Sequence, residues 1–141
     1  MAITVHCDIV SAEEKVFSGL VELLVCVGEG GELGVKPGHA PLLTRLNPGP
    51  VHLVKQDGSK EFVYVEGGFL EIQPNLVTVL ADSAVRAADI DEAAAQQAKD
   101  AAEREIGDKV ANRELTEVAV QLSRAIGKLR TLKEARKAMG R

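Results

Sequence analysis

Hydrophobic and polar residues in the first half of the chain alternate in the patterns of β-strands. Apolar residues alternate with polar ones over residues 3–9, which is the period of a half-buried strand. Residues 20–27 form a nearly continuous aliphatic run, typical of a strand buried on both faces. Two pairs of apolar segments flank turn residues and predict hairpins, namely 51–54 with 61–65 and 70–72 with 76–80. Short strands at this spacing indicate an antiparallel sandwich or barrel.

The second half of the chain has the period of helices. Asp89, followed three residues later by Glu92, predicts the start of a first helix, and Gly107 predicts its end. This helix carries a stripe of small residues: Ala94, Ala98, Ala101 and Ala102. A second helix from about Asn112 carries an apolar seam that we expect to pack on the stripe: Leu115, Val118, Leu122, Ile126, Leu129 and Leu132. Gly127 within it costs roughly 1 kcal/mol relative to alanine, so this helix need not be rigid by itself.

Composition and charge change along the chain as the hydrophobic period does. All five prolines and all Phe and Tyr residues lie before residue 75, whereas alanine becomes abundant after residue 80. Residues 1–86 carry 6 basic and 11 acidic side chains, residues 87–114 carry 4 and 8, and residues 115–141 carry 7 and 2. The net charge of −4 therefore conceals a basic second helix. We predict a β domain over residues 1–86 and a two-helix antiparallel hairpin over residues 87–141.

The composition disfavours several classes of function. An overall acidic charge and an aromatic content of only 3% argue against a nucleic-acid-binding surface. No apolar run approaches the roughly 18 residues of a transmembrane helix, and no secretory signal is visible at the start. Cys7 and Cys26 lie in apolar strand contexts and are interpreted as core thiols in a reducing compartment.

No arrangement of residues predicts an active site or a metal centre. The glycine cluster at residues 28–34 contains two glutamates and lacks the Gly-Lys-Ser/Thr of a phosphate-binding loop, so we interpret it as a surface loop. His6, His39 and His52 are dispersed without the spacing of metal ligands. We expect His6 and His52 to be structural and His39 to orient its loop by hydrogen bonding. The residues favour an interaction or regulatory module, with an unrecognised enzyme as the alternative.

Three blocks of the sequence carry a resemblance to a known family. They are residues 10–13 with 17–20, residues 31–44, which read GELGVKPGHAPLLT, and residues 77–82. On these blocks the chain resembles the epsilon subunit of the bacterial F-type ATP synthase, over essentially its whole length. The resemblance implies a ten-stranded antiparallel β-sandwich near residues 1–86, followed by a C-terminal helical hairpin and without an active site of its own.

The resemblance also implies a place in a rotary motor. Epsilon subunits lie in the rotating central stalk beside the gamma subunit, and their sandwich rests on the membrane-embedded ring of c subunits. Glu32 and His39 match family positions at the contact with that ring, although turn geometry is an alternative reason for both residues. Such a subunit of a proton-translocating synthase is expected at the cytoplasmic face of the bacterial inner membrane, held there by its partners without inserting into the bilayer.

The second helix matches the family's inhibitory arm. In bacterial members the arm folds down on the sandwich or extends into the catalytic head of alpha and beta subunits, where it suppresses ATP hydrolysis. A basic helix suits that role because it could face acidic loops of the beta subunits. A solvated charged face is the alternative for each of the six candidate residues: Arg124, Lys128, Arg130, Lys133, Arg136 and Lys137. A freestanding sandwich module with a docking arm is the alternative to the motor subunit as a whole.

One family feature is only partly present. Some members bind ATP on the folded hairpin through an Ile/Leu-Asp-x-x-Arg-Ala motif. Here the segment begins Ile90-Asp91 and has Ala94 where the motif has arginine. Because a charged, multidentate contact is missing, we expect ATP binding to be weak or absent. We expect Asp91 to complete the helix N-terminus instead, and we expect no resident cofactor or metal.

Overall fold

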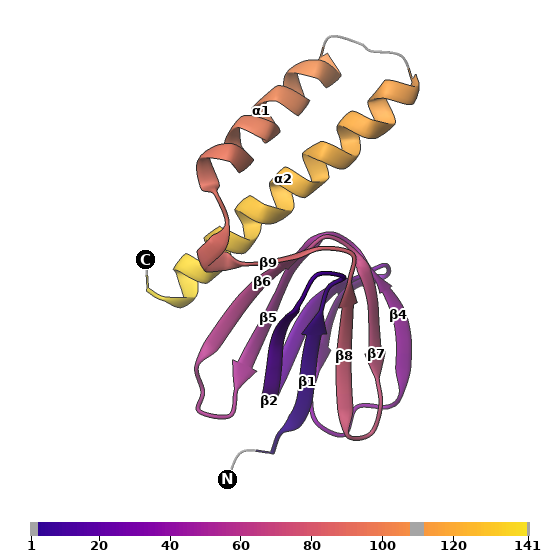
Figure 1. Cartoon of the computed structure of the whole chain (residues 1–141), viewed down its shortest axis with the longest axis vertical. Helices are drawn as coiled ribbons and strands as arrows, with labels where there is room; N and C mark the ends of the chain where they lie inside the picture. Colours follow the sequence, from indigo (N-terminus) through magenta and orange to yellow (C-terminus); the bar gives the residue numbers. More distant parts are fainter. Residues whose placement is uncertain (1–2, 108–111, 141) are drawn as a thin grey trace.

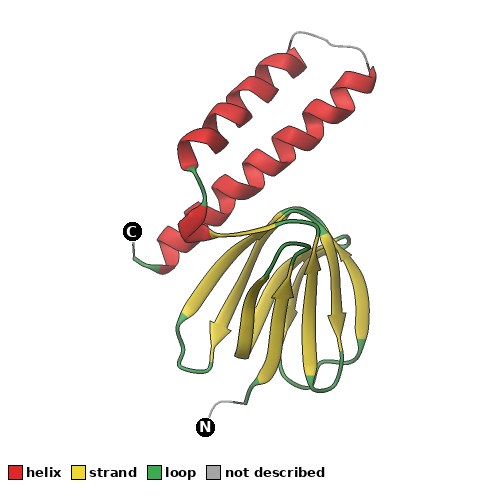
Figure 2. Ribbon diagram, in the orientation of Figure 1, coloured by secondary structure: helices red, strands yellow, loops and turns green. Residues whose placement is uncertain are grey.

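A layered β domain and a helical hairpin make up the chain (Figures 1 and 2). The computed structural model describes residues 3–107 and 112–140, with side chains from residue 116 onward in the second range. Over these residues the β domain has nine strands: β1 (Val5–Val10), β2 (Lys15–Gly28), β3 (Gly31–Val35), β4 (Leu42–Leu46), β5 (Gly49–Lys55), β6 (Lys60–Val65), β7 (Gly68–Ile72), β8 (Leu76–Ala81) and β9 (Ala84–Arg86).

One long strand joins the two layers of the sandwich. β2 pairs with β1 through its first half and with β5 and β3 through its second half. The first layer continues from β1 through β8 and β7 to β4, and the second contains β3, β2, β5, β6 and β9. The pairing of β2 with β5 shifts register between Val21 and Leu23, where the pairing with β1 ends. Such an irregularity lets a strand bend from one layer into the other.

The implied sandwich is confirmed with two corrections. The described residues form nine strands rather than ten, because residues 15–28 are one continuous strand that serves both layers. The sheet is also not purely antiparallel, since β1 and β8 pair in parallel from His6 opposite Leu76 to Val10 opposite Leu80. A parallel pair cannot be closed by a tight turn, and these two strands are joined through all the strands between them.

The core lies between the two layers and is built from alternate strand residues. β1 and β8 both bury every second side chain, as a period of two requires. Cys7 and Cys26 are fully buried free thiols in this cluster, which confirms the prediction of core cysteines. Burial raises the pKa of the Cys7 thiol to about 12 and that of Cys26 to about 11. Neither thiol is therefore ionised near neutral pH.

The hairpin begins with a single 3-10 turn, η1 (Ala87–Asp89), and continues with α1 (Glu92–Gly107) and α2 (Asn112–Ala138). The predicted end of the first helix at Gly107 and the start of the second at Asn112 are confirmed. The capping residue predicted at Asp89 is wrong by two residues. Asp91, not Asp89, caps α1, because its Oδ1 accepts a hydrogen bond of 3.0 Å from the backbone N–H of Ala94.

The predicted packing of the two helices on one another is confirmed in part. Ala102 of the predicted stripe is buried, whereas Ala94, Ala98 and Ala101 are more exposed, and Ala95, which lies outside the stripe, is buried as well. On α2, Val118 of the predicted seam is buried, whereas Ile126 is 44% exposed and Ala125, outside the seam, is buried. Almost every position of α1 is small or polar, so several stripes satisfy helical spacing equally well. Leu115, which we assigned to the seam, lies outside the residues whose side chains are described.

Only α2 lies broadly against the sandwich. Its C-terminal half crosses β5 and β6, while α1 packs on α2 and leans away from the sheet (Figure 1). Across the described residues, neither helix is long and apolar enough to span a membrane.

Candidate functional site

Two of the six candidate basic residues of α2 bind acidic side chains of the sandwich. Arg124 Nε lies 3.1 Å from Glu66 Oε1 in the connection between β6 and β7. One and a half turns further, Arg130 Nη2 lies 3.3 Å from Glu32 Oε2 on β3. Arg130 also contacts Glu134 of its own helix at 3.2 Å. The excess of acidic residues in the β domain thus supplies ion-pair partners for the basic helix when the arm is folded on the sandwich.

A third arginine closes the hairpin itself. Arg136 near the end of α2 binds both carboxylate oxygens of Glu92 in the first turn of α1, with the Nη1–Oε1 bond at 3.0 Å. The hydrogen bonds and charge of Arg136 lower the pKa of Glu92, and both groups are exposed to solvent. This bidentate pair connects the two ends of the arm that lie next to the sandwich.

The three candidate lysines make weaker contacts or none. Lys128 Nζ lies 5.8 Å from the ring centroid of Tyr64, within cation–π range. Lys133 and Lys137 are exposed, and neither forms an ion pair within the described part of the chain. In the folded arm these two lysines are thus exposed candidates without an acidic partner among the described residues.

The two candidate ring-contact residues do not lie together. Glu32 is the second residue of β3 and is bound by Arg130, whereas His39 lies in the turn that follows this strand. The His39 ring donates from Nδ1 to the carbonyl oxygen of Ala40 at 2.7 Å, so the expectation that this histidine orders its loop is confirmed. The glycine cluster before it is not a plain loop, because Gly31 lies opposite Gly28 in a hairpin of β2 and β3.

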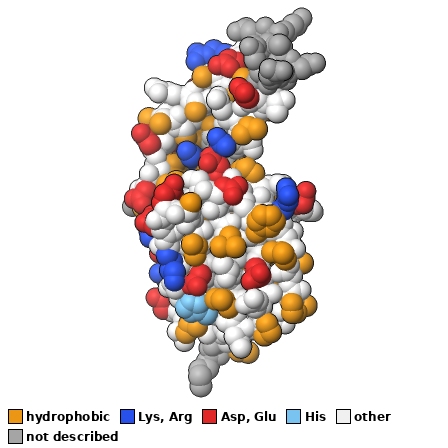
Figure 3. All heavy atoms as spheres, turned by 45° about the vertical axis from the view of Figure 1, so that its right-hand side comes forward, with side chains coloured by type: hydrophobic (Ala, Val, Ile, Leu, Met, Phe, Trp, Pro, Cys, Tyr) orange, Lys and Arg blue, Asp and Glu red, His pale blue; other side chains and the backbone are white. Residues whose placement is uncertain are grey.

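A patch of apolar side chains on the outer face of the first layer was not predicted. Leu43 on β4, Phe69 on β7 and Leu80 on β8 are 64%, 42% and 50% exposed. Phe69 lies opposite both Leu80 and Arg45, whose guanidinium carbon is 5.6 Å from its ring centroid. Figure 3 shows apolar side chains gathered on this side of the sandwich. The available signal was a strand with apolar residues on both faces, since residues 76–80 carry leucine at outward positions (Leu76, Leu80) as well as valine at inward ones.

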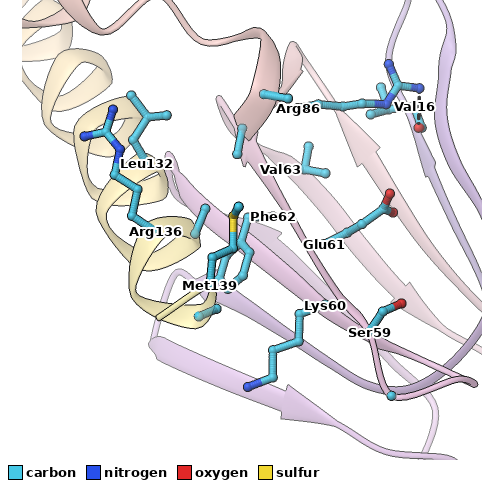
Figure 4. A pocket seen from close by; sticks show the side chains of 15 residues that line it. Val16, Ser59, Lys60, Glu61, Phe62, Val63, Arg86, Leu132, Arg136 and Met139 are labelled. Carbon is cyan, nitrogen blue, oxygen red and sulfur yellow. Dashed lines mark hydrogen bonds between the residues drawn. The ribbon is translucent and has the colours of Figure 1, made fainter. Parts of the chain in front are cut away.

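Two of the hollows that border the arm lie beside α1 and beside β6. One of about 580 Å³ lies between α1 and α2 and includes Asp91, Ala94, Arg124 and Lys128 in its lining. Asp91 is engaged there as the helix cap, which confirms the preferred interpretation of this residue. The other, of about 620 Å³, separates the last turns of α2 from β6, with Leu132 and Met139 above Phe62 (Figure 4). No group of three or more side chains able to ligate a metal occurs among the described residues.

A sandwich with an uncovered apolar face, joined to a helical arm held by exposed charges, is typical of a subunit that functions within an assembly. Family models of the ATP synthase Delta/Epsilon chain match both parts, the beta-sandwich domain over residues 4–87 and the long alpha-helix domain over residues 88–133. The chain belongs to this ATP synthase Delta/Epsilon family and is therefore a non-catalytic stalk subunit of the multisubunit complex.

Solved structures of ATP synthases contain similar chains. A chain in the Euglena gracilis mitochondrial ATP synthase, in a structure of its OSCP, F1 and c-ring in rotational state 1, has a TM-score of 0.80 and 20% identity and covers 95% of this chain and 81% of its own. A chain in the central stalk and c-ring of the Tetrahymena thermophila mitochondrial ATP synthase has a TM-score of 0.49 and 15% identity, covering 60% of this chain and 68% of its own. The first of these likenesses supports the fold described above.

Proposed function

We propose that this chain is the central-stalk rotor subunit of a proton-translocating F-type ATP synthase, where it connects the gamma subunit to the c-subunit ring and restrains ATP hydrolysis through its helical arm. The observation that carries the proposal is the uncovered apolar patch of Leu43, Phe69 and Leu80. Full burial of such a side chain contributes roughly 1.5–3 kcal/mol, so covering the exposed halves of three favours a stable partner by about a few kcal/mol. Within this family the partner that we infer for the patch is the gamma subunit.

The sandwich suits the transmission of torque because its layers are cross-linked. β2 is hydrogen-bonded into both layers, and β1 pairs with β2 as well as β8, so neither layer slides without breaking ladder hydrogen bonds. We infer that the segment from Glu32 to His39 meets the c-ring. Since these residues lie at opposite ends of β3, a contact that uses both would extend along that strand.

Inhibition would require the arm to leave the sandwich. Its contacts through Arg124 and Arg130 are ion pairs at least partly open to solvent, which contribute about 0–1 kcal/mol each. Acidic loops of the beta subunits could therefore compete with Glu66 and Glu32 for the same guanidinium groups. In a released arm whose helices have also separated, so that Arg136 leaves Glu92, all six candidate basic side chains would be open to the alpha and beta subunits of the catalytic head.

The location and ligands that we propose follow from these partners. The subunit would be peripheral at the cytoplasmic face of the bacterial inner membrane, attached through gamma and the c-ring. We expect no resident cofactor and weak or absent ATP binding, because Asp91 is engaged as a helix cap and Ala94 supplies no charge. Calorimetry with ATP tests this expectation, which a dissociation constant at or below micromolar would overturn.

Copurification with the gamma subunit tests the apolar patch. We expect the wild-type chain to retain gamma and the Phe69→Asp/Leu80→Asp double variant to lose at least tenfold of it, because two charges would be buried in the interface. Val120→Asp on α2 is the control, since Val120 is as exposed as Phe69 but lies off the patch, at 44% against 42%. Equal retention by all three chains would contradict the proposed gamma interface, and failure of the wild type to retain gamma would favour a freestanding module.

ATP hydrolysis by the assembled synthase tests the arm. Lys133→Gln/Lys137→Gln removes two charges that form no ion pair within the described residues, so it should leave the folded arm intact while weakening contact with the head. We expect hydrolysis to rise severalfold, and to rise further when all six basic residues are neutralised or residues 112–141 are removed, with ATP synthesis largely retained. Lys15→Gln/Lys55→Gln is the charge-matched control, because both lysines lie on the sandwich outside the segment from Glu32 to His39. Unchanged hydrolysis in every arm variant would contradict an inhibitory role.

A further inference from the structure

A glycine in the interior of α2 lies directly against the single tyrosine of the chain. A Cβ atom added at Gly127 would lie 2.6 Å from Cε1 and 3.4 Å from Cδ1 of Tyr64. Carbon atoms do not approach to 2.6 Å without a shift of one of the groups. Since glycine is the least favourable helix residue after proline, its presence in the interior of α2 needs a reason other than helix formation. The close approach of the Tyr64 ring supplies that reason.

The Tyr64 ring has little freedom to move aside. Its side chain is among the largest fully buried ones and is 1% exposed. Its backbone is held on both sides, opposite Pro50 of β5 and opposite Val85 of β9. The hydroxyl has no hydrogen-bond partner among the described residues, so the contact depends on the shape of the ring rather than on a polar bond.

Neighbouring residues of α2 add further interactions around the contact between Gly127 and Tyr64. Thr131 is fully buried, and its hydroxyl donates to the carbonyl oxygen of Gly127 at 2.8 Å. Lys128 lies over the Tyr64 ring at 5.8 Å from its centroid. Arg124, one turn before Gly127, reaches Glu66, two residues after Tyr64. The buried centre of the contact between arm and sandwich is therefore the pair of Gly127 and Tyr64, and the charged contacts surround it.

Other parts of the same interface are open. Beyond Leu132 the hollow of about 620 Å³ separates the end of α2 from β6 (Figure 4). On the opposite side of the helix, a second hollow of about 310 Å³ lies between Ile126 and the start of β5 at Pro48 and Gly49. Docking is thus concentrated on a short stretch of α2, which makes it sensitive to a single methyl group at residue 127.

We propose that the contact between Gly127 and Tyr64 sets the balance between the docked and released arm, with glycine selected at residue 127 because no larger side chain can dock. The inference deepens the proposed function, on which its regulatory meaning rests, while the contact itself belongs to the isolated chain. A methyl group at residue 127 would collide with Tyr64 only when α2 is docked. It therefore lowers the docked population without weakening the helix, which alanine stabilises in either position.

The chain contains its own reporter for this contact. Because it has one tyrosine and no tryptophan, fluorescence excited at wavelengths too long for its phenylalanines to absorb comes from Tyr64 alone. Quenching by acrylamide measures how far the ring is open to solvent in the intact full-length chain. N-acetyltyrosinamide supplies the value for a fully exposed ring.

We expect Gly127→Ala to shift the docking equilibrium by about tenfold toward the released arm, a typical effect of overfilling a packed contact. The acrylamide quenching constant should rise toward that of the free tyrosine derivative, and Gly127→Val should raise it further. Gly107→Ala is the matched control, because it replaces a helical glycine that has no described atom within 4 Å of an added Cβ. It should leave the quenching constant at the wild-type value.

A wild-type quenching constant in both Gly127 variants would overturn the inference. Thermal unfolding of the sandwich, followed by circular dichroism in the β region, separates release of the arm from loss of the fold. If the constant rises only because the sandwich unfolds, the inference is also overturned. A Tyr64→Leu/Gly127→Ala double variant supplies an independent measure by hydrogen exchange of β6 amides. It should protect those amides better than Gly127→Ala alone, since the smaller side chain leaves room for the methyl group.

ATP hydrolysis by the assembled synthase then separates this inference from the proposed function. Gly127→Ala should lower hydrolysis severalfold, because a larger share of arms is released toward the head. If quenching rises while hydrolysis stays at the wild-type rate, the contact controls docking as inferred, and the inhibitory role is contradicted.

Discussion

The sandwich and the arm are held together by different kinds of contact. The sandwich buries one continuous cluster of large aliphatic side chains, with Leu24, Leu53 and Leu70 fully enclosed. The arm buries mostly small ones, with Ala95 and Ala102 in α1. Since hydrophobic stabilisation scales with the apolar area removed from water, each contact in the arm contributes much less. The comparison shows how one chain combines a stiff part, suited to transmitting force, with a part that can be released.

The largest effect is expected where a sandwich glycine is replaced. Gly68 has a φ of +126°, and an added Cβ would lie 2.0 Å from the Leu80 carbonyl oxygen. Gly68→Ala should therefore lower the free energy of unfolding by roughly 4 kcal/mol, from backbone strain together with overpacking. Urea unfolding measures this loss. Gly58→Ala, which has a positive φ but no described atom within 4 Å of its new Cβ, should lose only about 1 kcal/mol.

A cavity in the sandwich core should have the next largest effect. Leu24 has no exposed surface, and Leu24→Ala should lower the free energy of unfolding by about 3 kcal/mol. On α2, Leu132 is half-buried beside a hollow. Leu132→Ala should destabilise the arm by less than about 1.5 kcal/mol and leave the free energy of unfolding of the sandwich unchanged. Equal losses in the two variants, measured by urea unfolding, would remove the energetic distinction between sandwich and arm.

Salt should affect the arm and spare the sandwich. Arg124→Gln removes one exposed ion pair and should weaken docking by at most about 1 kcal/mol. In the wild type, tyrosine quenching should increase between low salt and molar salt, because exposed charges are screened. The Arg124→Gln variant should respond less to salt. If salt leaves the tyrosine quenching of the wild type unchanged, the charges around Tyr64 contribute nothing to docking.

The smallest effect is expected from acid. The pKa of Glu92 is lowered in the folded chain by its hydrogen bonds to Arg136, so this pair stabilises the hairpin above the ordinary pKa of 4.5. That contribution is lost as the pH falls through the lowered pKa of Glu92. Helical circular dichroism should therefore weaken slightly more below pH 4.5 in the wild type than in Glu92→Gln, which has no carboxyl group to protonate. If helical circular dichroism depends on pH identically in the two chains, the pair of Glu92 and Arg136 does not stabilise the hairpin.

Local features of the sequence predicted the elements that depend on local physics. The hairpins around Asp57-Gly58 and Pro74-Asn75, and the break between the helices at Gly107, follow from turn residues and the hydrophobic period, and all are present. Strands β3, β4 and β9 were not predicted. They are short or rich in glycine, and they form because neighbouring strands offer hydrogen bonds to them.

The charge of the candidate site could be predicted from the sequence, but the acidic residues that pair with its basic side chains could not. The basic character of α2 is visible in the sequence, whereas the pairing of Arg130 with Glu32 joins residues 98 positions apart. Glu32 and His39 are close in the sequence, yet β3 separates them. The apolar patch was missed because outward leucines in a strand are distinguished from core residues only once the sheet shows which face is covered.

The sequence by itself determined the order of a β domain and a helical hairpin, the family to which they belong and the charge of each part, because periodicity, turn chemistry and charge are properties of neighbouring residues. Only the tertiary structure decided how the arm docks. In the sequence Gly127 is a weak point of a helix, and in the fold it lies so close to the Tyr64 ring that an added Cβ would collide with it. That difference arises because steric fit between α2 and β6 depends on two backbones that the chain brings together only after both have formed.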